Sequence, residues 1–236
     1  MLQAKKITIR FGGLTALYDV SICFSNSDIF GLIGPNGAGK TTLINALTGF
    51  QKFERGSTFV DSINISRLKP HLIARIGIAR TFQGGRLFGR LSALENAESG
   101  AIGIGLNRKK ARKCAMEILG WMGLLGKSAL PANSLPYGDI RKIGIARALA
   151  SNPNYLLLDE PGAGLNDFES AKLMEMILKI RDDFKCGILL VEHNMRLVMG
   201  VCERVHVLNG GRSLVEGTPE EIQSEASFRQ AYLGNG

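Results

Sequence analysis

One segment of the sequence has residue types and spacing that are typical of phosphate binding. Residues 34–42 read GPNGAGKTT, which matches the pattern GxxxxGK[ST], and they follow an apolar run and precede a helix-forming stretch. Glycines let successive backbone N–H groups point at phosphate oxygens, and the N-terminus of a helix adds partial positive charge. The predicted phosphate-binding residues are Gly34, Pro35, Asn36, Gly37, Ala38, Gly39, Lys40, Thr41 and Thr42.

The last three side chains of this loop have separate predicted roles. Lys40 can reach the β- and γ-phosphates of a nucleotide, so we expect it to stabilise charge during catalysis as well as in binding. The hydroxyl of Thr41 suits Mg²⁺, and Thr42 can hydrogen-bond another phosphate oxygen. A chance match in a glycine-rich turn is the alternative, and the strand and helix on either side of the loop argue against it.

A pair of acids ends another apolar run. Asp159 and Glu160 directly follow residues 155–158, which read YLLL and are typical of a buried strand. Acids at strand ends are common, so this signal is weak by itself and becomes strong only beside a phosphate-binding loop. We predict that Asp159 holds Mg²⁺ through water and that Glu160 polarises the attacking water.

A histidine follows a third apolar run. His193 comes shortly after residues 187–191, so a parallel sheet would place it at the carboxyl edge, where open α/β sheets bind ligands. A lone histidine is usually structural, and the catalytic interpretation depends on the neighbouring motifs. We predict that the neutral imidazole of His193 contacts the γ-phosphate and the water.

The elements that must position these residues alternate between short aliphatic strands and helices, which indicates an α/β fold with a largely parallel sheet. Residues 20–24, 29–33, 155–158 and 187–191 are predicted strands, and residues 40–47 a helix. Helical patterns dominate between residues 91 and 150. We therefore predict a single nucleotide-binding domain over residues 1–236, with an α/β catalytic core (1–90 and 151–236) and a helical subdomain (91–150).

With these motifs in order, the sequence resembles the ATP-binding cassette (ABC) ATPases from end to end, and within them the ATPase subunits of branched-chain amino-acid importers. Further segments that carry the resemblance are residues 10–14, 80–83, 192–194, 217–222 and 231–234. The resemblance implies that Phe11 stacks on adenine. It also implies that Gln83 contacts both the metal and the water and relays to the membrane subunits.

The resemblance further implies a fold, ligands and partners. The fold is a P-loop NTPase (RecA-like) core with an N-terminal antiparallel β subdomain and an inserted helical subdomain. The ligands are ATP and Mg²⁺. The partners are transmembrane permease subunits, a second ATP-binding subunit and, indirectly, a solute-binding protein. The expected location is cytoplasmic, peripheral on the inner face of the cell membrane through the permease.

The segment that corresponds to the family signature LSGGQ departs from it. Residues 135–139 read LPYGD, and the resemblance implies that Leu135, Tyr137 and Gly138 contact the nucleotide held by the second subunit. Pro136 lacks the hydroxyl and the N–H that would bind a γ-phosphate, and Asp139 adds a negative charge near a negative ligand. A second departure is Asn166, where the family usually has aspartate.

The altered signature leads to a hypothesis about assembly. The intact loop at residues 34–42 beside the altered residues 135–139 favours a heterodimer, in which the partner supplies the intact signature to this chain's site. The alternative is a homodimer that tolerates Pro136.

Charge and composition bound the remaining alternatives. The net charge is +8, and residues 67–147 contain 15 Lys and Arg against 4 Asp and Glu, a local excess of +11. Such a segment allows a nucleic-acid-linked ABC ATPase, but one cassette without zinc-ligand clusters or a long coiled coil argues against that function, and we expect no nucleic-acid partner. No apolar run approaches the roughly 20 residues of a membrane span. A lipopolysaccharide-export ATPase is the closer alternative, and Glu160 argues against a non-hydrolysing regulatory module.

Overall fold

The structure, a computed structural model, describes residues 1–82, 84–225 and 228. Gln83 and the predicted tail segment at 231–234 lie outside the described residues. The strands are β1 (Leu2–Phe11), β2 (Leu14–Phe24), β3 (Ile29–Ile33), β4 (Arg55–Val60), β5 (Ile63–Asn64), β6 (Ile78–Arg80), β7 (Tyr155–Asp159), β8 (Gly187–Val191), β9 (Arg204–Asn209) and β10 (Arg212–Gly217). The helices are α1 (Lys40–Leu47), α2 (Pro70–Ile76), α3 (Ala93–Gly103), α4 (Arg108–Trp121), α5 (Tyr137–Leu149), α6 (Asp167–Phe184), α7 (Met195–Val201) and α8 (Pro219–Ser224), with 3₁₀ turns at Leu125–Lys127 and Ala132–Ser134.

The strands form two sheets. The first is antiparallel, with the order β2-β1-β4-β5, and the second has the order β10-β9-β3-β8-β7-β6. Within the second sheet β9, β3, β8, β7 and β6 run parallel, and β10 pairs antiparallel to β9 at its edge. The predicted α/β class with an antiparallel N-terminal subdomain is therefore confirmed.

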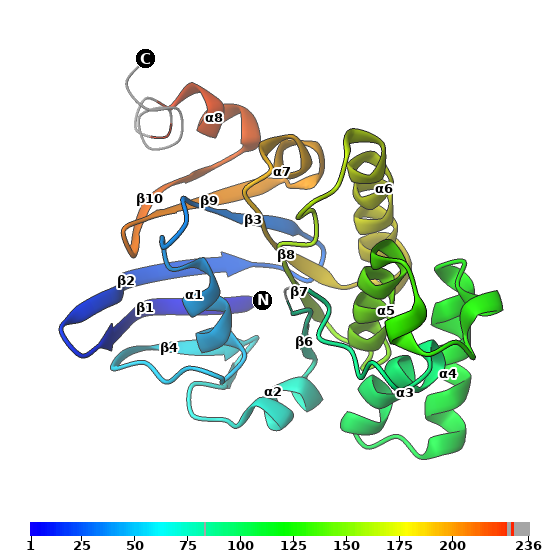
Figure 1. Ribbon diagram of the computed structural model, residues 1–236. Coiled ribbons are helices and arrows are strands. Elements are labelled where there is room, and N and C mark those ends of the chain that lie inside the picture. Colours follow the sequence, from blue (N-terminus) through cyan, green and yellow to red (C-terminus); the bar gives the residue numbers. More distant parts are fainter. Residues whose placement is uncertain (83, 226–227, 229–236) are drawn as a thin grey trace.

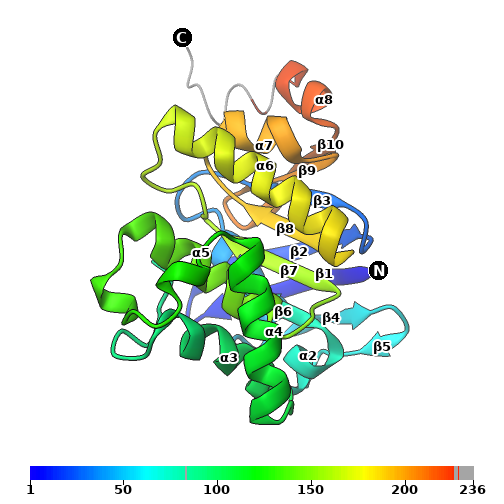
Figure 2. The same cartoon turned by 90° about the vertical axis from the view of Figure 1, so that its right-hand side faces the viewer.

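The parallel sheet separates two hydrophobic cores. In β7, Leu156 and Leu158 pack among the helices, whereas Tyr155 and Leu157 pack toward the antiparallel sheet and α1. Both faces of the strand are covered, which explains its uninterrupted apolar sequence. Figure 1 shows the antiparallel sheet and α1 on one side of the molecule and α5 and α6 on the other, and Figure 2 shows α4, α5 and α6 in front of the parallel sheet.

Helices make up the regular structure between β6 and β7. A capping box at Ser92 and Glu95 begins α3, and the side chain of Asn107 begins α4. Helices α3 and α5 pack closely at Gly100, where a Cβ atom would lie 1.9 Å from the carbonyl oxygen of Arg147. This helical region is the insertion that the sequence predicted.

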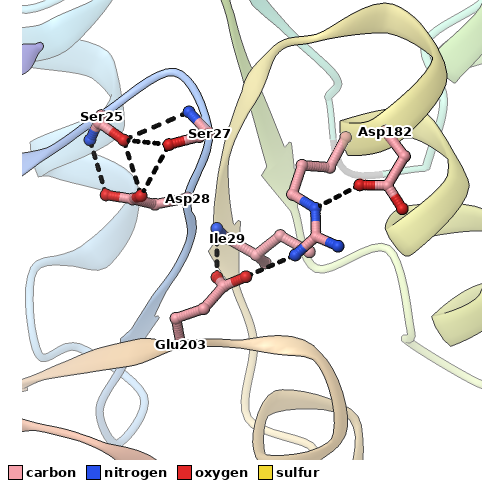
Figure 3. Close-up of polar contacts among 7 residues, drawn as sticks. Ser25, Ser27, Asp28, Ile29, Asp182 and Glu203 are labelled. Atoms are coloured by element: carbon pink, nitrogen blue, oxygen red, sulfur yellow. Dashed lines mark hydrogen bonds and ion pairs between the residues drawn. The ribbon is translucent and has the colours of Figure 1, made fainter.

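Polar contacts fix the amino end of β3, opposite the edge where the predicted site residues lie. Asp28 accepts hydrogen bonds from the backbone N–H and the hydroxyl of Ser25, at 2.8 and 2.6 Å (Figure 3). The carboxylate of Glu203 accepts the N–H of Ile29 at 2.5 Å and pairs with Arg181. Strand β3 is thereby anchored at its start.

Candidate functional site

The glycine-rich loop connects β3 to α1, as predicted, and its backbone is pressed against β2 and β9. Gly39 has φ +103°, and a Cβ atom on it would lie 2.6 Å from Leu17 Cδ2. A Cβ atom on Gly34 would lie 2.3 Å from the carbonyl oxygen of Leu208. Both positions therefore require glycine, because the neighbouring strands leave no room for a Cβ atom at either one and Gly39 also adopts a left-handed conformation.

Lys40 is buried in the curl of this loop. Its Nζ donates to the carbonyl oxygens of Gly34 at 2.6 Å and Pro35 at 3.1 Å. Burial lowers the pKa of Lys40, and the negative charges of Glu160, Asp159 and Glu192 oppose that shift. The ammonium group therefore lies in a site with nearby acids, where it can neutralise an added anion.

Asp159 ends β7 and Glu160 directly follows the strand, and the two acids lie in different environments. Asp159 is buried, and this burial raises the pKa of its carboxyl group, whereas the Arg80 guanidinium lowers it. Glu160 is half-buried and has φ +49°, a left-handed conformation that costs a non-glycine residue about 1–3 kcal/mol. Its N–H donates to the carbonyl oxygen of Val191 at 2.9 Å, so β8 helps hold the strained turn.

Strand register gathers the predicted residues at one edge of the sheet. Leu32 near the end of β3 pairs with Val191, and Val191 pairs with Asp159. The loop after β3, the acids after β7 and His193 after β8 therefore lie beside one another at the carboxyl edge. Phe11, at the end of β1, has a side chain that is 49% exposed and can stack on a planar ligand.

Glu192 is a site residue to which the sequence analysis assigned no role. It is fully buried, and its carboxylate accepts the N–H of Gly162 at 2.5 Å and that of His193 at 3.1 Å. One buried acid thus fixes the segment after Glu160 and the backbone of His193 together. The available signal was an acid directly after an apolar strand, where an unsatisfied carboxylate would be costly.

The predicted signature residues begin α5, apart from α1. Figure 1 shows α1 and α5 on different sides of β6 and β7. Leu135 is buried, whereas Tyr137 and Gly138 are exposed. Pro136 is the N-cap of α5 and provides no side-chain hydrogen bond, so the helix begins without a capping side chain.

Side chains around this first turn are engaged within the chain. Asp139 forms an ion pair with Lys127 at 2.5 Å. Arg141 lies over the Tyr137 ring at 5.0 Å and donates to the carbonyl oxygen of Ala163 at 2.6 Å. Asn166, the second departure from the family pattern, caps α6 by accepting the N–H of Glu169 at 2.9 Å. Asn166 therefore has a structural role as a helix cap.

A groove lies between α2, β6 and the helical region, beside the segment that follows residue 83. Gly84 and Gly85 have φ of +72° and +75°, and Arg147 of α5 donates to the carbonyl oxygens of Gly85 and Arg86 at 3.0 Å each. This segment is therefore tied to α5. The groove is lined by residues that include Thr48, Phe50, Ile73, Arg80, Phe82, Arg86, Phe88, Ile104 and Arg147.

Comparison with known sequences gives consistent matches. Residues 17–163 match the family model described as "ABC transporter". The chain is 40% identical to the high-affinity branched-chain amino acid transport ATP-binding protein LivG of Salmonella typhimurium, over 99% of this chain and 98% of the relative. It is 37% identical to BraF of Pseudomonas aeruginosa, with the same coverage. Identity to the lipopolysaccharide export system ATP-binding protein LptB of Escherichia coli is 34%, over 99% of this chain and 97% of the relative.

Solved structures share the fold over nearly the whole chain. A nucleotide-free ATP-binding cassette from an ABC transporter superposes with a TM-score of 0.90 at 27% identity, covering 100% of this chain and 99% of the other. The dimeric, post-hydrolysis structure of the cassette MJ0796 bound to ADP and Pi has a TM-score of 0.82 at 27% identity, covering 93% and 99%.

Proposed function

The chain belongs to the ABC transporter family, and we propose that it powers the import of branched-chain amino acids as the ATP-hydrolysing subunit. Family membership confirms the resemblance predicted from the sequence and makes the chain a nucleotide-binding ATPase. The observation that carries the proposal is the meeting of the glycine-rich loop, buried Lys40 and the pair Asp159 and Glu160 at one sheet edge.

The residues present fit a magnesium-bound nucleotide. Thr41, at the start of α1, and Asp159, at the end of β7, offer hard oxygen donors, which Mg²⁺ prefers. Among the described residues no group of three or more His, Cys, Asp or Glu side chains could hold a metal ion. A cation held there by few protein oxygens would take its other ligands from phosphate and water, as Mg²⁺ does. When bound, Mg²⁺ would neutralise charge on the β- and γ-phosphates.

Different groups of this chain then have different roles in hydrolysis. Loop amides and Lys40 bind the phosphates, and Lys40 stabilises the charge that develops as the γ-phosphate leaves. Glu160, held by its strained turn, orients the attacking water and accepts its proton. Glu192 fixes the backbone of His193, whose exposed imidazole contacts the γ-phosphate. Phe11 stacks on the adenine, and Gln83 adds a contact to the metal and the water.

The remaining parts of the proposal concern partners. Among the described residues no helix is both long and apolar enough to cross a membrane. In this proposal separate permease subunits form the solute pathway, as in the family to which the chain belongs. The groove with the exposed rings of Phe50 and Phe88 is the surface that we assign to the permease. A second ATP-binding subunit contacts the nucleotide through its signature. A solute-binding protein acts further upstream, and the complex lies on the cytoplasmic face of the membrane.

The solute is tested in cells that lack this chain. Uptake of labelled leucine, isoleucine and valine should fall to background and return with the wild-type chain but not with Lys40→Ala. Uptake of labelled lysine serves as a control and should not change. Unchanged leucine uptake, together with intact ATPase activity of the purified chain, would reject the solute assignment alone. An absence of any Mg-ATP effect on thermal unfolding and of phosphate release with permease present would reject the whole proposal.

A further inference from the structure

We propose that Arg80 is a positioning residue that sets the carboxylate of Asp159 for magnesium, an inference that rests on the proposed function. Arg80 ends β6, and its side chain is only 7% exposed. It belongs to a segment whose family resemblance assigned a role to Gln83 and none to Arg80. Its contacts connect three parts of the site.

The guanidinium joins the acid to the helix that follows the glycine-rich loop. Its Nη2 donates to Asp159 Oδ2 at 3.0 Å, and its Nη1 donates to Asn45 Oδ1 at 2.6 Å and to Thr48 Oγ1 at 3.4 Å. Asn45 lies in α1 and Thr48 caps the end of that helix. A planar fork with several donors can hold both partners at fixed angles, which a lysine cannot do.

Two aromatic rings that line the groove contact the guanidinium of Arg80. The Arg80 Cζ lies 4.6 Å from the centre of the Phe82 ring and 5.7 Å from that of Phe50, and the two rings meet edge to face at 5.9 Å. These contacts restrict the rotamers of Arg80 and thereby the direction of its bond to Asp159. The hydroxyl of Thr81 also accepts the backbone N–H of Asp159 at 3.2 Å. Residues 80 and 81 therefore hold both the backbone and the side chain of the acid.

A positioning role of Arg80 and its positive charge predict opposite effects of its removal on the affinity for magnesium. The Arg80 guanidinium is positive, so by charge alone it repels a nearby cation, and its removal would tighten magnesium binding. If Arg80 acts by orienting the carboxylate, its removal instead weakens magnesium binding, by roughly 10–100-fold as for other residues that orient metal ligands. The sign of the change therefore separates the two roles.

The experiment uses the full chain and the variants Arg80→Gln and Arg80→Lys. Thermal unfolding is followed at saturating ATP over a range of magnesium concentrations, and ATP hydrolysis is measured over the same range. We expect both variants to need roughly 10–100-fold more magnesium for the half-maximal rise in melting temperature and for half-maximal hydrolysis. The affinity for ATP in EDTA should stay at the wild-type value, because the loop amides and Lys40 are unchanged.

Arg181→Gln is the matched control. The Arg181 side chain is 25% exposed and, like Arg80, donates to carboxylates, but these are Asp182 and Glu203 beside the amino end of β3, opposite the site. This variant should lower the melting temperature without changing the magnesium requirement. An unchanged or lower magnesium requirement in both Arg80 variants would overturn the inference. If Arg80→Gln does not fold, Arg80→Lys decides the same question. A wild-type chain that shows no Mg-ATP stabilisation would reject the proposed function instead.

Discussion

The glycine-rich loop and the first turn of α5 are both helix N-termini for which we propose contacts with phosphate, and they are built very differently. The loop is enclosed by its own chain: β2 and β9 press on its glycines, and Lys40 bonds its carbonyl oxygens. The turn at residues 136–139 begins with Pro136, which gives the helix no side-chain cap. Tyr137 and Gly138 are exposed, and Asp139 forms an ion pair with Lys127.

This difference indicates which contacts each region makes. The loop places the amides and the lysine that we propose bind phosphate beside Asp159 and Glu160 of the same chain, so its proposed chemistry depends on local packing. The turn of α5 offers one glycine, a helix N-terminus and an acid, and it has no hydroxyl at position 136. We infer that the loop binds nucleotide strongly in this chain, whereas the turn contributes weakly to a partner's nucleotide.

The largest expected effect concerns the acid beside the loop. Glu160→Gln keeps the shape of the side chain but cannot accept a proton, so hydrolysis should fall by roughly 10²–10⁴-fold. Binding of ATP should persist, because the loop and Lys40 are intact. Single-turnover hydrolysis and fluorescent-nucleotide binding measure the two quantities, with Glu175→Gln on α6 as control. Wild-type turnover in Glu160→Gln would remove this residue from its role.

A smaller but still large effect is expected at the loop itself. Lys40→Ala removes hydrogen bonds to charged oxygens, each of which contributes about 1.5–3 kcal/mol, so ATP affinity should fall by at least roughly 10–150-fold. Equilibrium binding of a fluorescent ATP analogue measures this loss. The matched control is Lys179→Ala, at an exposed position of α6. Equal affinities of Lys40→Ala and wild type would contradict the assignment of the loop.

Local patterns predicted the elements around the loop closely. The predicted strands 29–33 and 187–191 and the helix 40–47 coincide with β3, β8 and α1, because each is an uninterrupted apolar or helical run with clear boundaries. The predicted strand 20–24 is only the second half of β2 (Leu14–Phe24). The first half contains exposed and half-buried residues, so its pairing with β1 decides its structure more than its own pattern does.

Local sequence patterns could not predict contacts between segments that are distant in the sequence. The bridge from Arg80 to Asp159 and Asn45 spans three elements, and no local spacing encodes it. Glu192 accepts the backbone amides of Gly162, His193 and Asn194, and this convergence depends on the register of β8 with its neighbours. Pro136 and Asp139 were recognised as departures, but the compensation of Asp139 by Lys127 depends on how the turn at 125–127 packs beside α5.

The third prediction tests the weakness of the α5 turn. Replacing Pro136 by Ser and Asp139 by Gln restores a hydroxyl, a backbone N–H and a neutral side chain. One added hydrogen bond to a charged phosphate is worth at least about 1.5 kcal/mol, so the ATPase rate of the chain alone should rise by roughly 10-fold. The rate is measured as a function of protein concentration, because the gain requires a dimer.

The same measurement tests the heterodimer hypothesis. If this chain depends on a partner with an intact signature, the unmodified chain should show slow hydrolysis without cooperativity. Vigorous, cooperative hydrolysis through two equal sites in the unmodified chain would reject the hypothesis and favour the homodimer. In that case the variant with Pro136→Ser and Asp139→Gln should show no increase in ATPase rate. The glycine-rich loop and the α5 turn would then differ in structure but not in their contribution to hydrolysis.

The smallest effect is expected at Lys127, and it shows how far this residue neutralises the charge of Asp139 in the α5 turn. The side chain of Lys127 is 46% exposed and that of Asp139 15%, so the pair stabilises the fold by only about 0–1 kcal/mol. Lys127→Met also leaves Asp139 uncompensated beside a partner's phosphate, which should slow dimer-dependent hydrolysis by less than about 5-fold. Lys113→Met removes a more exposed ion pair, with Glu117 in α4, away from the α5 turn, and should not change hydrolysis. Adding Asp139→Gln to Lys127→Met should restore the rate, because no charge then remains to be neutralised. Slower hydrolysis that persists in this double variant would mean that Lys127 acts by packing, and the turn would then lack the electrostatic compensation that the ion pair indicates.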